Sequence, residues 1–175
     1  MAAPTIRQAL AQNLIYLRSY RRTPAAFRTY LIDAIGLWAR GMRQFRAWTP
    51  HLNKTLAVLD TTIDDIASRR TVAVLGSGPL FDVPVESLSR TFDRVLLIDL
   101  AHLSTIDRRI DRYTNVERIW RDLAPDGEPH PLAFLRDIPE LDWVISVNLL
   151  SQIGRAAPEG MERAVVDAHL DGLAM

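Results

Sequence analysis

Two features of the chain have residue types and a spacing that suit ligand binding. The first is Gly76-Ser77-Gly78, which directly follows the apolar run Thr71–Leu75. Glycine has no Cβ, so such a turn can approach a ligand closely and adopt dihedral angles that other residues avoid. The second is Asp99, which ends the next apolar run, 23 residues after Gly76. A carboxylate at that place can accept hydrogen bonds from both ribose hydroxyls. Together they predict a site for a cofactor that contains adenosine.

The turn does not match the fingerprint of dinucleotide-binding proteins. That fingerprint, G-x-G-x-x-G, requires a glycine at position 81, where this chain has Phe81. A bulky side chain there argues against a pyrophosphate resting on the N-terminus of the following helix. A nicotinamide-dependent oxidoreductase is therefore disfavoured, and a ligand without phosphates fits the turn better.

Four segments of the chain resemble motifs of the class I S-adenosylmethionine-dependent methyltransferases. "VAVLGSGPLFDVP" (72–84) looks like the glycine-rich first motif, and "VLLIDL" (95–100) looks like the second, whose terminal acid holds the ribose. "NVERIWRDL" (115–123) is similar to the third-strand region, and "LDWVISVNLLSQI" (141–153) is similar to the fourth strand. The resemblance spans about residues 50–157 and implies S-adenosylmethionine as the cofactor. The contact residues that it implies are Gly76, Ser77, Gly78, Asp99, Leu100, Asp122 and Asn148.

The chain departs from the family pattern at several positions. Val74 stands where an acidic residue is common, two positions before the first glycine, and Leu80 replaces the third glycine. Asp82 could supply one of the polar contacts that are lost. Asp122, which the resemblance places at the adenine amino group, is equally explained as a helix cap. Asn148, at the ligand-facing end of the fourth strand, is equally explained as a partner for backbone groups.

The elements that must position these residues follow from the hydrophobic pattern. The first 70 residues have a helical period, and from Thr71 short apolar runs alternate with helical stretches. We therefore expect an α/β, Rossmann-like fold with a parallel sheet of order 3-2-1-4 and an N-terminal helical appendage. The expected division is a helical region, 1–49, and an S-adenosylmethionine-binding domain, 50–175. The expected helices are about 5–20, 25–48, one that starts at Thr49-Pro50, and two separated by Pro158; the expected strands are 71–76, 94–100, 115–120 and 141–148.

This sheet is incomplete when it is compared with the seven strands of the family. The chain stops directly after the fourth helix, which leaves "WVISVN" (143–148) as an open edge with apolar residues on both faces. An open edge of this kind is liable to pair with another strand or to aggregate. We expect either that the chain is a fragment of a longer protein or that another copy covers the edge in a homo-oligomer.

Composition excludes several classes of site and location. The 175 residues contain no cysteine, which excludes disulfides, thiolate metal sites and cysteine catalysis. The four histidines are scattered without a paired spacing, so we expect no metal site. The chain has neither a long uncharged apolar run nor a signal-peptide core. We therefore expect no membrane span and a cytoplasmic location.

Basic residues concentrate in the N-terminal part of a chain whose net charge is zero. Residues 1–50 carry eight arginines and one aspartate. Four of the arginines are expected on one face of the helix 25–48: Arg28, Arg40, Arg43 and Arg46. Such a face can bind an anionic partner such as a nucleic acid. The alternatives are a solvated face and a face that meets acidic segments of the same fold.

The sequence favours a methyltransferase whose acceptor, a small-molecule substrate or a macromolecule, it does not identify. Methyl transfer from a sulfonium is an in-line displacement that depends chiefly on positioning, so no fixed catalytic residue is expected. Four side chains could line an acceptor pocket, although aromatic residues at helical spacing more often belong to a core: Tyr16, Tyr20, Tyr30 and His51. The alternative is a non-enzymatic or degenerate nucleotide-binding or interaction protein on the same fold.

Overall fold

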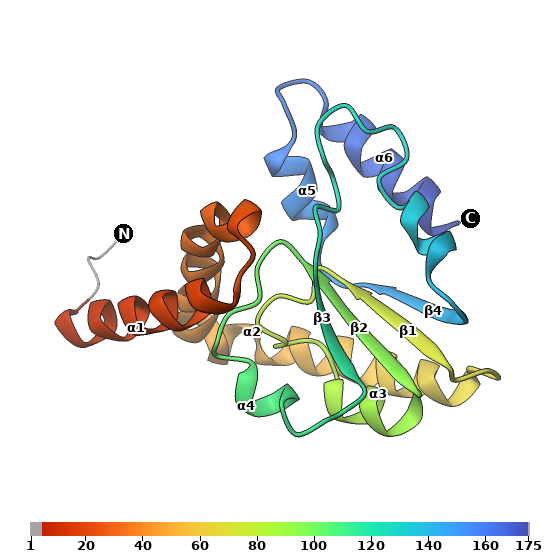
Figure 1. The fold of residues 1–175 in the computed structure, drawn as a ribbon, viewed down its shortest axis with the longest axis horizontal. Helices are drawn as coiled ribbons and strands as arrows, with labels where there is room; N and C mark the ends of the chain where they lie inside the picture. The colour runs from red at the N-terminus through yellow and green to blue at the C-terminus, as the bar shows by residue number, and fades with distance from the viewer. Residues whose placement is uncertain (1–4, 175) are drawn as a thin grey trace.

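The computed structural model describes residues 5–174 and contains a four-stranded parallel sheet with helices on both faces (Figure 1). The strand order is β3-β2-β1-β4, so the predicted α/β class and topology are confirmed. The strands are β1 (Thr71–Leu75), β2 (Arg94–Asp99), β3 (Val116–Trp120) and β4 (Leu141–Ser146). The helices are α1 (Ile6–Arg22), α2 (Leu31–Asp65), α3 (Val85–Thr91), α4 (Asp107–Ile110), α5 (Leu150–Ala156) and α6 (Glu162–Leu173), with 3-10 helices η1 (Ala25–Tyr30) and η2 (Ala133–Asp137).

The central strand β1 is apolar throughout because both faces of the sheet are covered. Val72 and Val74 belong to an apolar cluster that includes Leu59 of α2. Ala73 and Leu75 belong to a second cluster, on the other face, that includes Ile153 of α5. Figure 1 shows α2 and α3 below the sheet and α5 and α6 above it. A strand that buries side chains on both faces reads as a continuous apolar run rather than an alternating one.

The N-terminal helices pack beyond the carboxyl end of β2. Leu31 and Ile35 of α2 form a third apolar cluster with Ala101 and Leu103, which follow β2. Two polar contacts fasten α1 to the same region. The hydroxyl of Ser19 accepts the N–H of Ser104 at 2.9 Å, and Arg22 forms a 2.6 Å ion pair with Asp107 of α4. Part of the arginine-rich segment therefore faces an acidic group of its own fold.

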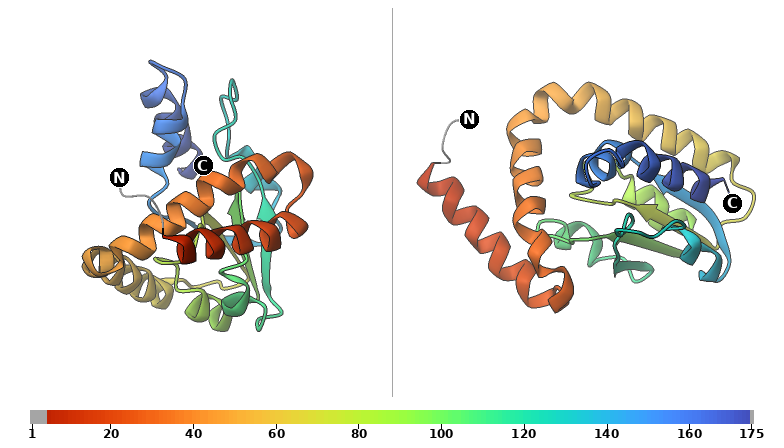
Figure 2. Two further views of the ribbon diagram at one scale, coloured as in Figure 1. Left: turned by 90° about the vertical axis from the view of Figure 1, so that its left-hand side faces the viewer. Right: turned by 90° about the horizontal axis from the view of Figure 1, so that it is seen from above.

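The helix break predicted at Thr49-Pro50 is wrong. A single helix, α2, runs from Leu31 to Asp65 with Pro50 inside it, across the expected division at residue 49. Figure 2 shows that the helix bends sharply near its middle instead of ending. A proline inside a helix removes one hydrogen bond and crowds the carbonyl four residues earlier, at a cost of about 3 kcal/mol. The burial of Leu52, Leu59 and Ile63 beyond the proline offsets that cost.

The segment predicted as one helix over 25–48 begins instead with the 3-10 helix η1. The expected apolar stripe and the expected arginine face both differ from the prediction. Leu31 and Ile35 are buried as the apolar stripe predicts, but Met42 and Phe45 are about half exposed (52% and 47%). Arg28 lies in η1, where its Nε donates to the carbonyl of Thr23 and its guanidinium stacks on a tyrosine ring. Arg28 is therefore not on the α2 face that carries the other three arginines.

The C-terminal helix α6 is packed closely against the sheet's upper cluster. A Cβ at Gly172 would lie 2.8 Å from the Cβ of Leu132, so only glycine fits there. His169, also of α6, is fully buried, and its Nε2 lies 2.9 Å from the hydroxyl of Ser146 at the end of β4. Burial lowers the pKa of His169 below its ordinary value. The neutral imidazole therefore helps to attach α6 to the end of β4 through its contact with Ser146.

Two glycine-to-alanine substitutions should have opposite effects on stability. Gly172→Ala should lower the free energy of unfolding by about 1–3 kcal/mol, because the new methyl group overlaps Leu132. Gly36→Ala, in α2, should raise it by about 0.5–1 kcal/mol, because nothing lies within 4 Å of the new methyl group and alanine favours the helix. Urea unfolding measures both. Equal effects would show that α6 does not pack as described.

The stability of the fold should fall on acidification, in part because of His169. The unfolded chain takes up a proton on this imidazole below pH about 6.5, whereas the folded chain resists it, so stability is complete above that pH and declines below it. Between pH 7.5 and 5.0, His169→Gln should therefore lose less stability than the wild type in urea unfolding. His130→Gln changes an exposed histidine and should keep the wild-type dependence. Identical pH dependence in the wild type and His169→Gln would contradict the assignment.

Candidate functional site

The carboxylate of Asp99 joins the turn after β1 to the loop after β2. Its Oδ2 accepts the N–H of Gly78 at 2.7 Å, and its Oδ1 accepts the N–H of Ala101 at 3.3 Å. The N–H of Gly76 in turn donates to the carbonyl of Ile98 at 2.8 Å. The glycine turn and the acid singled out in the sequence therefore lie together at one edge of the sheet. Each carboxylate oxygen keeps capacity for a further donor, because an ionised carboxyl offers about four acceptor positions.

The two glycines of the turn have different surroundings. Both have left-handed backbone angles, with φ of +67° at Gly76 and +49° at Gly78. A Cβ at Gly76 would lie 2.8 Å from Cδ1 of Leu149, so that side of the turn is filled by the chain itself. A Cβ at Gly78 would find no atom closer than the Gly76 carbonyl oxygen at 3.8 Å. Close approach of a ligand to the backbone is thus possible at Gly78, whereas Gly76 serves the packing of Leu149.

Leu80 keeps the backbone conformation that a third glycine would adopt. Its φ is +60°, a region that costs an ordinary residue about 1–2 kcal/mol. The fully buried leucine side chain offsets this cost, and Arg109 of α4 donates to the Leu80 carbonyl. The next side chain, Phe81, packs edge-on against Phe45 of α2 with ring centroids 6.3 Å apart. The turn therefore stays ordered despite its departures from the glycine pattern.

Five buried side-chain polar atoms, including Oγ1 of Thr105 and Nδ1 of His169, have no partner in the part of the chain that the structure describes. The other three belong to residues that follow or end β1, β2 and β3: the hydroxyl of Ser77, Nδ1 of His102 and Nε1 of Trp120. Trp120 lies beside Asp99 in the sheet, and its ring meets the His102 ring edge-on at 4.9 Å. The sequence did not single out His102 and Trp120 as site residues, since neither belongs to a motif. An unpaired buried polar group costs about 1–3 kcal/mol, so three of them at one edge point to a missing partner.

His102 presents an acceptor, and Trp120 presents a donor. The Nε2 of His102 lies 3.1 Å from the carbonyl oxygen of Ile119, which can only accept. The proton is therefore on Nε2, and Nδ1 carries a lone pair. Burial lowers the pKa of His102, although the nearby carboxylate of Asp99 opposes the shift. The imidazole is thus neutral, and the pair leaves one acceptor and one donor unpaired among the described residues.

Asp122 and Leu100, also singled out in the sequence, make no polar contact with Asp99's carboxylate. Oδ1 of Asp122 accepts the N–H of Ala124 at 2.9 Å and so closes a turn in the loop after β3. No helix starts there, so the alternative of a helix cap is wrong. Leu100 is half buried at the bend directly after β2.

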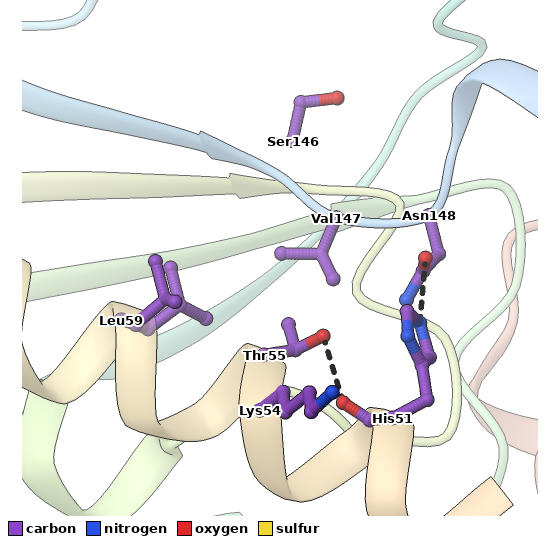
Figure 3. Close-up of a pocket in the computed structure, with 8 residues that line it drawn as sticks. His51, Lys54, Thr55, Leu59, Ser146, Val147 and Asn148 are labelled. Carbon is purple, nitrogen blue, oxygen red and sulfur yellow. Dashed lines mark hydrogen bonds between the residues drawn. The ribbon is translucent and has the colours of Figure 1, made fainter.

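Asn148 lies on the other side of β1, beside β4 and α2. Its Nδ2 donates to Oδ2 of Asp82, and its Oδ1 lies 3.3 Å from Nε2 of His51 (Figure 3). The backbone φ of Asn148 is +53°, a left-handed conformation that asparagine tolerates well. These contacts border an open cavity of about 420 Å³ between α2 and the end of β4, with Lys54 on its wall. The structure thus joins Asn148 to His51 and Asp82 rather than to Asp99.

Of the four aromatic side chains expected near an acceptor, only His51 lines this cavity. Tyr16 packs against the cluster around Leu31. Tyr20 lies under the guanidinium of Arg28, and Tyr30 contacts the ring of Phe27. The three tyrosines therefore belong to the packing of the N-terminal helices.

Comparisons with protein families, with curated proteins and with solved structures find no match for this chain. Among residues 5–174, no group of three or more His, Asp or Glu side chains is placed to hold a metal ion. Within the same range, no helix combines the length and the apolar character needed to cross a bilayer. The function must therefore be argued from the geometry of the sheet edge.

Two serine substitutions should change the free energy of unfolding in opposite directions, because one hydroxyl is unpaired and the other is paired. Ser77→Ala removes a buried hydroxyl without a partner and should raise the free energy of unfolding by about 1 kcal/mol. Ser146→Ala should lower it by about 1–3 kcal/mol, because it leaves Nε2 of His169 without its partner. Thermal and urea unfolding measure both changes. A loss of stability in Ser77→Ala would mean that its hydroxyl is satisfied in the folded protein.

Proposed function

We propose that this chain binds S-adenosylmethionine at the carboxyl edge of β1 and β2 and transfers its methyl group to an acceptor. The observation that carries the proposal is the contact between Asp99 and Gly78, which holds an open glycine beside an acid with free acceptor positions. The site also lies outside the carboxyl ends of parallel strands, where open α/β sheets bind their ligands.

The residues at this edge fit the chemical groups of that cofactor. Asp99 would accept hydrogen bonds from the ribose hydroxyls, and the methionine part would lie against the open backbone at Gly78. Ser77, His102 and Trp120 offer a hydroxyl, an acceptor and a donor, all without partners in the described chain, to the remaining polar atoms. When bound, the cofactor supplies an activated methyl group on a sulfonium. The chain's own task is to hold the acceptor in line with that methyl group.

A binding protein without turnover is the second candidate, because Leu149 fills the space at Gly76 and Leu80 replaces a glycine. A nicotinamide dinucleotide stays disfavoured, since Phe81 occupies the third glycine position of that fingerprint. Three further expectations stay predictions: a nucleic-acid partner at the α2 arginines, self-association through the β4 edge, and a cytoplasmic location.

Calorimetric titration tests the proposed cofactor directly. The wild type should bind S-adenosylmethionine and its demethylated product, and NAD should give no binding heat. Ser77→Ala should weaken S-adenosylmethionine binding about tenfold, the effect of one lost hydrogen bond to a ligand, while the protein itself becomes more stable. Asp99→Ala should abolish binding.

Asp93→Ala is the matched control, because Asp93 is an exposed acid just before β2. It should bind S-adenosylmethionine as the wild type does. Binding of NAD alone, or of none of the three compounds, would reject the proposal. Binding that Ser77→Ala and Asp99→Ala leave unchanged would place the cofactor elsewhere.

A further inference from the structure

A chain of three polar side chains lies where the sheet's connections change direction. β1 leads to β2 on one side, and β4 lies on the other, so the crevice between β1 and β4 is the topological switch point of this sheet. Asp82, in the loop after β1, accepts from Asn148, which follows β4, and Asn148 contacts His51 of α2. His51 and Asn148 line the cavity (Figure 3), and Asp82 joins them from a third segment through its contact with Asn148.

The hydrogen bonds among Asp82, Asn148 and His51 fix the tautomer of His51. An ionised carboxylate such as Asp82 only accepts, so the amide of Asn148 must turn its NH₂ group toward it. The amide oxygen of Asn148 then faces Nε2 of His51, and that nitrogen must carry the proton. Nδ1 is consequently the nitrogen with the lone pair.

Nothing in the described chain uses that lone pair. His51 is exposed on α2, and its Nδ1 is hydrogen-bonded to no group among residues 5–174. Lys54 and Thr55 of α2 lie beside it on the cavity wall, and Thr55 is occupied with the backbone carbonyl of His51. Among the residues that these contacts name, the titratable ones are Lys54 on the same helix and Asp82, which Asn148 links to His51.

We propose that His51 is the proton acceptor for the methyl-accepting atom, with Asn148 and Asp82 as its positioning residues. This inference rests on the proposed function. The acceptor's oxygen or nitrogen forms a bond to the methyl carbon, and the carbon–sulfur bond of the sulfonium breaks with its electron pair left on sulfur. The acceptor's proton passes to Nδ1 of His51, which becomes an imidazolium. The acceptor class is a compound with a hydroxyl or amino group at the reacting atom, because such a group has a proton to lose.

Long-range ¹H–¹⁵N spectra of the full chain, recorded without any methyl donor, test the tautomer. In the wild type, His51 should be protonated on Nε2, and His51→Gln identifies its signals. Asn148→Gly preserves the left-handed backbone but removes the amide, and Asp82→Ala removes its anchor. In both variants the share of Nε2–H should fall toward that of a free histidine, which has a smaller preference for this tautomer. The double variant Asp82→Asn with Asn148→Asp exchanges amide and acid and should keep the wild-type share. The carboxylate then at position 148 would accept from His51 directly, and the amide then at position 82 would donate to that carboxylate.

A wild-type His51 protonated on Nδ1, or one unaffected by Asn148→Gly, would overturn the proposal. Acylation by diethyl pyrocarbonate near pH 7, mapped by peptide mass spectrometry, tests the lone pair separately. His51 should react as readily as exposed His130 and far faster than buried His102 and His169. An unreactive His51 would also overturn the proposal. Because neither experiment contains the cofactor, their failure is distinguishable from a calorimetric failure of the proposed function.

Discussion

The carboxylate of Asp99 is the interaction on which the proposed cofactor site depends. It accepts N–H groups from Gly78 and Ala101, which follow different strands, and so sets the turn after β1 against the loop after β2. The parallel sheet makes this contact possible, because its strands all end at one edge. The same loop after β2 carries His102 and packs under the N-terminal helices through Ala101 and Leu103. One half-buried acid at this edge thus connects the glycine turn, the unpaired polar atoms and the helical appendage.

The parts of this structure that sequence could predict are those fixed by local pattern. Both faces of β1 and β2 are buried, so each is an uninterrupted apolar run, and the glycine turn with Asp99 followed from their ends. The path of α2 through Pro50 was not predictable in this way, because burial of residues beyond the proline decides it. The contact of Leu149 with Gly76 was equally hidden, since it joins segments more than 70 positions apart.

β1 divides the carboxyl edge into two chemically distinct halves. On the β2 side lie Asp99 and the unpaired atoms of Ser77, His102 and Trp120. On the β4 side lies the hydrogen-bonded chain of His51, Asn148 and Asp82. A single turn after β1 contributes to both halves, with Gly78 on one side and Asp82 on the other. Its anchoring by Arg109 and by buried Leu80 therefore steadies both groups at once.

The bend of α2 has a geometric consequence for the whole molecule. A straight helix of 35 residues would be about 52 Å long, well beyond the roughly 30 Å width of a small domain. Its outer end would stand free in solvent with its apolar side chains uncovered. Because it bends near its middle, α2 instead lies along two sides of the domain. His51 directly follows Pro50 near that bend. The helix that packs along the domain therefore also places an exposed imidazole at the crevice between β1 and β4.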